Sequence, residues 1–313
     1  MKPWIFIFGL SVGAGLHAQP LPLHEQQYRI AFGAGSHPGA GQETWLNVAE
    51  HKPSHFTWVG SLTPAAPKTG LLFQQQLEKQ KFHPQYLPFA QQVSISGIWY
   101  WAVPPLHEDS AKALAPKFNQ FLGRAPESTT WYSQRLGPAD GKIQMIHLDT
   151  WSHALAGDTN NMVLHPAQWD WLAKELQSTE PVLRVIVTGK SIHWRSRSGQ
   201  SWKSFPAARR KLLDMVAAQS KPTLFVSGTY PCGALSTSQW KGKNLVELHT
   251  FGLNQVRVKL GKPGQLVTLR DAFCQRNFAL VTLDYREPMS LHIALQDVQN
   301  FLVWEWKGFL EDF

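Results

Sequence analysis

The chain has 313 residues, with 30 basic and 22 acidic side chains and a formal net charge of +8. This length suits one large domain or two small ones, and the charge favours anionic partners such as phosphate esters or anionic envelope surfaces. The sequence contains no basic low-complexity tail and no nucleic-acid-binding motif, so a dedicated nucleic-acid role is not expected.

Residues 1–18 have the pattern of a secretory signal peptide. Lys2 precedes an apolar run over 4–16, and Leu-His-Ala at 16–18 offers a small-residue cleavage site. The alternative is a retained membrane anchor, but the run is short for a spanning helix and three glycines interrupt it. We therefore expect a periplasmic or secreted protein with no transmembrane span after signal removal.

Apolar runs and amphipathic segments alternate through the first two thirds of the chain. Strands are predicted at 29–33, 56–60, 91–103, 142–150, 182–189 and 223–228. Helices are predicted at 42–52, 71–81, 108–122, 165–177 and 205–218. From Asn244 onward strands dominate, at 245–251, 256–260, 278–285, 291–296 and 301–307. This order predicts one α/β domain over 19–313 built from mixed sheets.

The segment 223–235 (TLFVSGTYPCGAL) shows where a binding site should lie. Its apolar first half delivers the end of a buried strand to a loop, and ligands of open α/β sheets bind at such strand ends. The loop itself, however, offers no carboxylate and no imidazole.

Eight further motifs follow in order along the chain: RIAFGAGSH, FTWVGSLTPAA, GIWYWAVPP, IHLDTW, AQWDWLAKEL, SWKSFPAARRKLL, NLVELHTFGL and NFALVTLDY. Together with the SGTYPCGA loop they resemble the motifs of PhoD-like alkaline phosphatases and phosphodiesterases. The resemblance covers nearly the whole mature chain. It implies a four-layer αββα metallophosphoesterase-like sandwich with mixed sheets.

The residues that would bind metal in that family are replaced throughout. The positions of its cysteine, aspartate, histidine, arginine and glutamate side chains hold Gly35, Ser61, Ala66, Tyr100, Trp101, Ala102, Val103, Trp151, Thr229, Pro231 and Ala234. A dinuclear centre needs carboxylate, imidazole or thiolate ligands to replace the hydration of the ions. The resemblance therefore implies a divergent member with no metal and no cofactor, a pseudoenzyme that acts by binding.

An alternative site is a rearranged mononuclear or metal-free hydrolase centre around Asp149. His147 and Asp149 alternate on a predicted strand and so share a face, while His153 and His193 follow in nearby loops. The competing structural interpretation is that Asp149 caps a turn and the histidines lie at the surface or in satisfied hydrogen bonds.

Serine nucleophiles are a further possibility, at predicted strand ends. Ser36, Ser61 and Ser227 occupy such positions, but none lies in a G-x-S-x-G elbow. The serine signal is therefore weak.

Aromatic and basic side chains gather around the same loops. We predict a binding face for an envelope protein partner, with an anionic surface as another possible target, made by Tyr100, Trp101, Trp151, Trp194, Arg195, Arg197 and Tyr230. The alternative is that the rings only fill the vacated crevice and that the basic run is a solvated loop.

The chain has two cysteines, Cys232 and Cys274, each in a predicted loop beside a strand. An exported protein meets an oxidising compartment. We therefore predict a Cys232–Cys274 disulfide.

Overall fold

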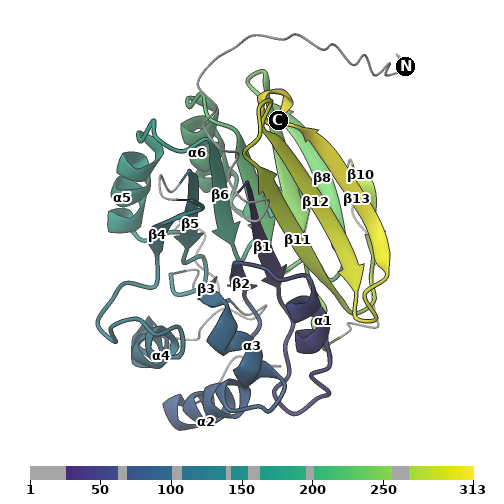
Figure 1. The fold of residues 1–313 in the computed structure, drawn as a ribbon. Helices are drawn as coiled ribbons and strands as arrows, with labels where there is room; N and C mark the ends of the chain where they lie inside the picture. The colour runs from purple at the N-terminus through teal and green to yellow at the C-terminus, as the bar shows by residue number, and fades with distance from the viewer. Residues whose placement is uncertain are drawn as a thin grey trace.

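The computed structural model describes residues 26–62, 69–100, 108–138, 142–153, 163–194, 201–255 and 268–313. The predicted signal segment 1–18 and the predicted strand 256–260 lie outside these ranges. The described residues form two mixed β-sheets that face each other, with helices on both outer sides (Figure 1).

The first sheet has six strands in the order β13-β12-β11-β1-β2-β3. They are β1 (Gln27–Gly33), β2 (His55–Val59), β3 (Ser94–Ile98), β11 (Asn277–Asp284), β12 (Ser290–Asp297) and β13 (Leu302–Phe309). The strands β1, β2 and β3 are parallel, whereas β11, β12 and β13 pair antiparallel. The β-rich end of the sequence thus completes the sheet that the first strand begins.

The second sheet has seven strands in the order β10-β8-β9-β7-β6-β5-β4. They are β4 (Tyr132–Leu136), β5 (Ile143–Leu148), β6 (Leu183–Thr188), β7 (Thr223–Ser227), β8 (Gly233–Trp240), β9 (Lys243–His249) and β10 (Thr268–Phe273). The neighbours β5, β6, β7 and β9 run parallel. All five residues of β7 are buried, as its apolar sequence predicts.

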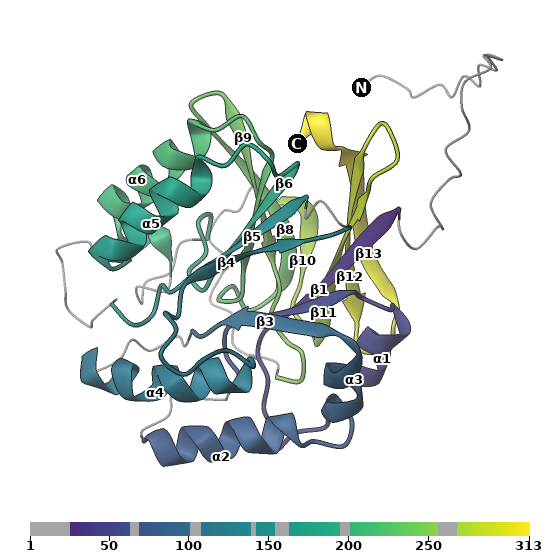
Figure 2. The ribbon, with the colours of Figure 1, turned by 60° about the vertical axis from the view of Figure 1, so that its left-hand side comes forward.

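The described residues include six α-helices. They cover the outer faces of the sheets (Figure 2). Those over the first sheet are α1 (Thr44–Glu50), α2 (Gly70–Lys81), α3 (Tyr86–Gln92) and α4 (Glu108–Phe121), and those over the second are α5 (Pro166–Leu176) and α6 (Pro206–Ala217). Helix α5 begins where its sequence indicates, with proline in the first turn and the side chain of His165 accepting from the backbone N–H of Ala167.

Three apolar clusters fill the spaces between these layers. One lies between the sheets, a second joins the first sheet to α1–α4 around Trp45 and Trp58, and the third joins the second sheet to α5 and α6 around Trp202. The prediction of a four-layer αββα sandwich with mixed sheets is confirmed. No helix in the described part of the chain is long and apolar enough to cross a membrane.

The structure differs from the sequence prediction in two segments. Residues 86–92 form α3, which includes the first two residues of the predicted extended stretch 91–103. Tyr86 and Phe89 both pack on Trp45 from one helical face. Residues 233–240 form β8, although the loop after the strand 223–228 was expected to include 233 and 234 and no element was predicted for 235–240. This strand pairs antiparallel with β9 from Ala234 to Trp240.

Candidate functional site

The parallel strands of both sheets end at a common edge, and there the backbones touch. Gly228 follows β7, and a Cβ on it would lie 2.0 Å from the carbonyl oxygen of Val59. The N–H of Ser61, just after β2, donates to the carbonyl of Tyr100 over 2.7 Å. The strand ends of the two sheets are thus in direct contact where an open sheet would present a crevice.

Tyr100 is the side chain at the centre of this contact. Its ring is 2% exposed, and a Cβ on Gly189 would lie 2.1 Å from a ring carbon. The next residue, Lys190, places its Nζ 5.4 Å from the Tyr100 ring centroid and 5.1 Å from that of Phe205. Burial lowers the pKa of Lys190 to about 7. The aromatic rings of Tyr100 and Phe205 and the amine of Lys190 therefore fill the space at the strand ends.

Asp149, just after β5, lies buried beside this region and has all of its lone pairs engaged. Its Oδ1 accepts from the backbone N–H groups of Trp151 and Ser152 at 3.0 and 2.9 Å. Its Oδ2 accepts from Trp99 Nε1 at 3.0 Å, from Ser152 Oγ at 2.5 Å and from the Thr130 hydroxyl. Asp149 organises the turn at 149–152, as the structural interpretation of this residue proposed.

A cavity of about 280 Å³ opens above Asp149, between α4, the loop 128–131 and the start of α5. His153 and His165 lie at its wall with ring centroids 4.7 Å apart. Within the described ranges, no three His, Cys, Asp or Glu side chains are grouped so that they could hold a metal ion.

The four residues of the alternative hydrolase site lie in three separate places. Asp149 and His153 line the cavity. His147 is buried between the two sheets, stacked on the Tyr132 ring with centroids 4.2 Å apart. His193 belongs to a polar network on the outer face of the second sheet, bonded to Ser236 and Ser238.

The predicted binding residues are placed mostly inside. Tyr100, Trp151 and Tyr230 are each 2% exposed, while Trp194 is half-buried with its ring edge-on to Tyr230 at 5.6 Å. Trp101, Arg195 and Arg197 lie outside the described residues. The three buried rings act as filling in this conformation, and their role in partner binding stays a prediction.

The network on the outer face of the second sheet centres on Glu247 of β9, which is fully buried. Its carboxylate accepts from Ser227 Oγ at 2.6 Å, Ser191 Oγ at 3.0 Å, and the N–H groups of Ile192 and His193 at 3.0 and 2.9 Å. These donors come from β7 and from the segment after β6, so one carboxylate joins three parts of the sheet.

Two imidazoles flank this carboxylate, with His193 Nδ1 at 3.6 Å and His249 Nε2 at 3.5 Å from Glu247 Oε2. Burial lowers the pKa of His193 to about 4 and that of His249 to about 3. Both imidazoles are therefore neutral at neutral pH, and these contacts are not ion pairs. Instead each ring bonds to serine hydroxyls.

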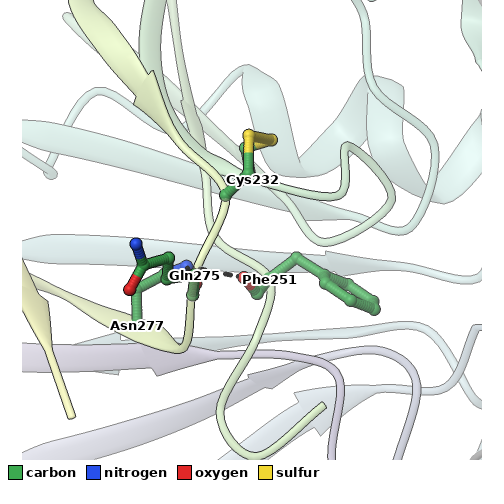
Figure 3. The surroundings of a disulfide bond; sticks show 5 residues. Cys232, Phe251, Gln275 and Asn277 are labelled. Atoms are coloured by element: carbon green, nitrogen blue, oxygen red, sulfur yellow. Dashed lines mark hydrogen bonds between the residues drawn. A yellow bond between two sulfur atoms is a disulfide. The ribbon is translucent and has the colours of Figure 1, made fainter. Parts of the chain in front are cut away.

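The predicted disulfide between Cys232 and Cys274 is present, with Cα atoms 4.1 Å apart. It joins the start of β8 to the end of β10, and the amide of Asn277 beside it donates to the carbonyl of Phe251 over 2.7 Å (Figure 3). Cys232 and Ala234 pack in one cluster with Tyr230 and Trp194, and the Tyr230 ring lies 5.1 Å from that of His249. The bridge therefore lies close to the Glu247 network.

Sequence reasoning missed Glu247, Ser236 and Ser238. Glu247 matches the glutamate of the NLVELHTFGL motif but was not singled out, since it stands in an apolar strand pattern. Of the serines that were considered, Ser36 donates to Gln80 at 3.0 Å and Ser227 donates to Glu247. Ser236 and Ser238 are two positions apart, and side chains two positions apart on a strand share a face. This spacing is the feature of the sequence that indicates the serine pair.

Two facing mixed sheets between helical layers are the fold of the metallophosphoesterases, and solved structures of that class superpose on this chain. PhoD matches with a TM-score of 0.60 at 12% identity, over 91% of this chain and 68% of that chain. Purple acid phosphatase PPD1 from yellow lupin (Lupinus luteus) seeds matches with a TM-score of 0.62 at 12% identity, over 93% of this chain and 55% of its own length. At this identity the likeness concerns the fold. No protein-family model and no curated protein sequence matches the chain.

Proposed function

We propose that this chain is an exported pseudophosphatase, a protein with the metallophosphoesterase fold that has lost its metal centre and acts by binding in the cell envelope. The observation that carries the proposal is the closed contact of the strand ends around Tyr100. Where ligands of such folds bind, Gly189 and Gly228 leave no space even for a Cβ. The scaffold is kept, while the space for ions is occupied.

The chemistry of the side chains at this edge supports the same conclusion. Ser61, Tyr100 and Thr229 offer neutral hydroxyl groups, which are weak ligands for divalent ions. Lys190 is a base that would repel a metal ion when protonated and lies against rings. A dinuclear centre that generates a hydroxide nucleophile requires anionic donors instead.

The alternative of a phosphoric-ester hydrolase around Asp149 is less well supported. The five hydrogen bonds to the Asp149 carboxylate leave it no lone pair for a metal ion or a substrate proton. His147 and His193 lie in other parts of the molecule, each with its own hydrogen-bond partner.

The proposed partner is an envelope protein that contacts the loops around Trp194. Trp194 is the ring of the predicted face that the described structure leaves partly exposed. Arg195 and Arg197 follow it directly in the sequence, and aromatic and arginine side chains are enriched at protein interfaces. An anionic surface would be attracted by the same charges.

One experiment tests the loss of the metal centre. Protein purified without chelator should contain no stoichiometric Fe, Zn, Mn or Ca by mass spectrometry, and should not hydrolyse p-nitrophenyl phosphate or bis(p-nitrophenyl) phosphate. One bound equivalent of metal, with activity that Asp149→Ala abolishes and the exposed control Asp170→Ala retains, would overturn the proposal in favour of the hydrolase.

A second arm of that experiment tests binding. Affinity capture of the full mature chain after chemical crosslinking of intact cells should yield one defined envelope protein, whose recovery falls at least about tenfold in Trp194→Ala, as for an interface hot spot. The matched control is Trp171→Ala, a half-buried tryptophan on α5. Equal recovery with both variants, in protein shown to be folded, counts against this face as the interface.

A further inference from the structure

Ser238 is the most accessible member of the Glu247 network. Along β8, Leu235 packs into the core between the sheets, so Ser236 and Ser238 point to the opposite, outer face. Ser238 is half-buried, whereas Ser236, Glu247 and His249 are fully buried. Its Oγ lies 2.8 Å from His193 Nε2. A serine hydroxyl at the surface is thus paired with a buried imidazole.

The carboxylate at the other end of the network determines where each proton lies. Glu247 can only accept, so Ser227 donates to it at 2.6 Å. The oxygen of Ser227 is then left to accept from His249 Nδ1 at 3.3 Å, which makes Nε2 of that ring an acceptor. The position of each proton is therefore determined from Glu247 to His249.

The same reasoning continues to the surface. Ser236 donates to His249 Nε2 at 2.8 Å, a shorter contact than the 3.4 Å to the Glu247 carbonyl. Ser236 then accepts from His193 Nδ1 at 2.8 Å. His193 Nε2 is consequently unprotonated and accepts from Ser238. The hydrogen bonds therefore form one directed chain, in which each group donates to the next from Ser238 inward to Glu247.

We propose that Ser238 is a nucleophile activated by His193 as general base, and that this pair hydrolyses small carboxylic esters without a metal ion. A serine hydroxyl bonded to a neutral imidazole, which a further group holds in the correct tautomer, is the arrangement that activates serine for attack on an acyl carbon. Here Ser236, His249, Ser227 and Glu247 are positioning residues. The inference concerns the outer face of the second sheet and does not depend on the proposed pseudophosphatase role.

The surroundings of Ser238 are suited to this reaction. Burial keeps His193 uncharged at neutral pH, since its pKa lies at about 4, so its Nε2 is unprotonated. The same burial makes it a weaker base than an ordinary imidazole, and the activation rests on the 2.8 Å contact with Ser238 Oγ. The guanidinium of Arg209 lies 5.7 Å from the ring centroid of Trp240, two residues along the same face of β8, and donates through Nε to the carbonyl of Ile192. A ring and a cation therefore lie on the face of β8 that carries Ser238, and the proposal assigns the ring to the apolar acyl group and the cation to the developing oxyanion of an ester.

The reaction balances with water as the only co-reactant. Ser238 Oγ forms a bond to the acyl carbon as its proton moves to His193 Nε2. The C–O bond to the leaving alcohol then breaks, and that proton passes to the alkoxide. In the second half, water gives a proton to His193 and its oxygen attacks the acyl-serine. The Oγ–C bond breaks, the carboxylic acid leaves and Ser238 recovers its proton.

The test is covalent labelling of the full mature chain with diisopropyl fluorophosphonate, which forms an O–P bond to serine and releases fluoride and a proton. Peptide mapping should place the label on Ser238. The labelling rate should fall at least about 100-fold in His193→Gln, the scale of general-base catalysis. It should also be flat above about pH 5 and decline toward pH 4, following the imidazole. Hydrolysis of p-nitrophenyl acetate should follow the same pattern.

Two controls make the result decisive. Ser133→Ala removes a half-buried strand serine that donates to Glu175 rather than to histidine, and should leave labelling unchanged. If His193→Gln does not fold, alkylation of Ser238→Cys by iodoacetamide replaces it, with a rate expected to exceed that of free cysteine at pH 7. Absence of label on Ser238 in folded protein, or labelling that Ser238→Ala leaves unchanged, would overturn the proposal.

Discussion

Two buried histidine clusters in the described part of the chain are built differently. Between the sheets, His55 of β2 and His147 of β5 share one hydroxyl, that of Ser96, at 2.7 and 3.0 Å. Among the described residues, Nδ1 of each ring has no hydrogen-bond partner. On the outer face of the second sheet, both nitrogens of His193 and His249 are bonded. Both clusters are buried, but only the outer one is satisfied.

The two clusters differ in that the outer one contains a carboxylate, that of Glu247. Glu247 accepts only, so it imposes one direction on every hydroxyl and imidazole that follows it. Within the described residues the inner cluster has no acidic group. Ser96 can donate to one imidazole and accept from the other, and Gln134 Nε2 lies 3.1 Å from His55 Nε2, so no acceptor-only group sets the direction of these bonds. Histidine burial in itself therefore does not indicate function. A buried imidazole becomes chemically useful where an acceptor fixes its tautomer and an accessible group lies at the end of the chain.

The largest effect is expected from removing this acceptor. Glu247→Ala leaves two hydroxyl donors and the Ile192 N–H without their partner inside the protein, and leaves the His193 N–H only its 3.2 Å contact with Ser191 Oγ. Each lost partner is worth about 1–3 kcal/mol. We expect the free energy of unfolding to fall by at least about 4 kcal/mol in urea denaturation at pH 7. The matched control is Glu180→Ala, an exposed acid whose contact with Arg135 at 3.6 Å should be worth less than about 1 kcal/mol.

A direct comparison of the clusters replaces one histidine in each by phenylalanine. His193→Phe breaks hydrogen bonds to Ser236 and Ser238 and should cost about 2–3 kcal/mol. His147→Phe keeps the stacking on Tyr132 and removes the unpartnered Nδ1 together with the Nε2 bond to Ser96. The Ser96 hydroxyl keeps His55 and Thr57 as partners, so a change within about 1 kcal/mol is expected. Urea denaturation of the two variants at pH 7 measures both values. Equal losses would show that the two clusters contribute alike.

The smallest effect is expected in the loss of stability at acidic pH. Burial lowers the pKa of His55 to about 4 and the pKa of His147 well below its usual range, whereas the unfolded values are near 6.5. Below pH 6.5 the unfolded chain thus binds more protons, so stability rises with pH toward 6.5 and is lost as pH falls toward 4.

His147→Phe removes one of these groups. Its loss of unfolding free energy between pH 7 and pH 5 should be smaller than that of the unmodified protein by about 1–2 kcal/mol. Parallel denaturation curves at the two pH values provide the measurement. An unchanged difference would mean that His147 is not buried in its neutral form.

The layers of the fold could be predicted because packing determines them. The run 223–227 is buried on both faces and reads as a core strand, and proline in the first turn marks the start of α5. Strand β8 escaped prediction for a physical reason. Its sequence GALSTSQW lacks large β-branched residues, because its outer face carries the small hydroxyl groups of Ser236 and Ser238 in place of an apolar row.

The candidate sites could be predicted only in part. The disulfide followed from two cysteines and an expected compartment. The pairing of Ser238 with His193 joins positions 45 residues apart, and it arises from the β8–β9 register and the path of the chain after β6, neither of which a motif encodes. Likewise, the sequence does not show whether the carboxylate of an aspartate such as Asp149 is saturated with hydrogen bonds or available for catalysis.

The glycine contacts at the strand ends have a consequence for the history of the molecule. Under the proposed function, a return to metal chemistry is obstructed by more than missing ligands. Space for ions would first require removal of the Tyr100 ring from Gly189, and emptying a buried aromatic site costs about 3–5 kcal/mol. That loss would precede any gain from a restored carboxylate. The filled edge therefore makes the loss of the metal centre hard to reverse by single substitutions.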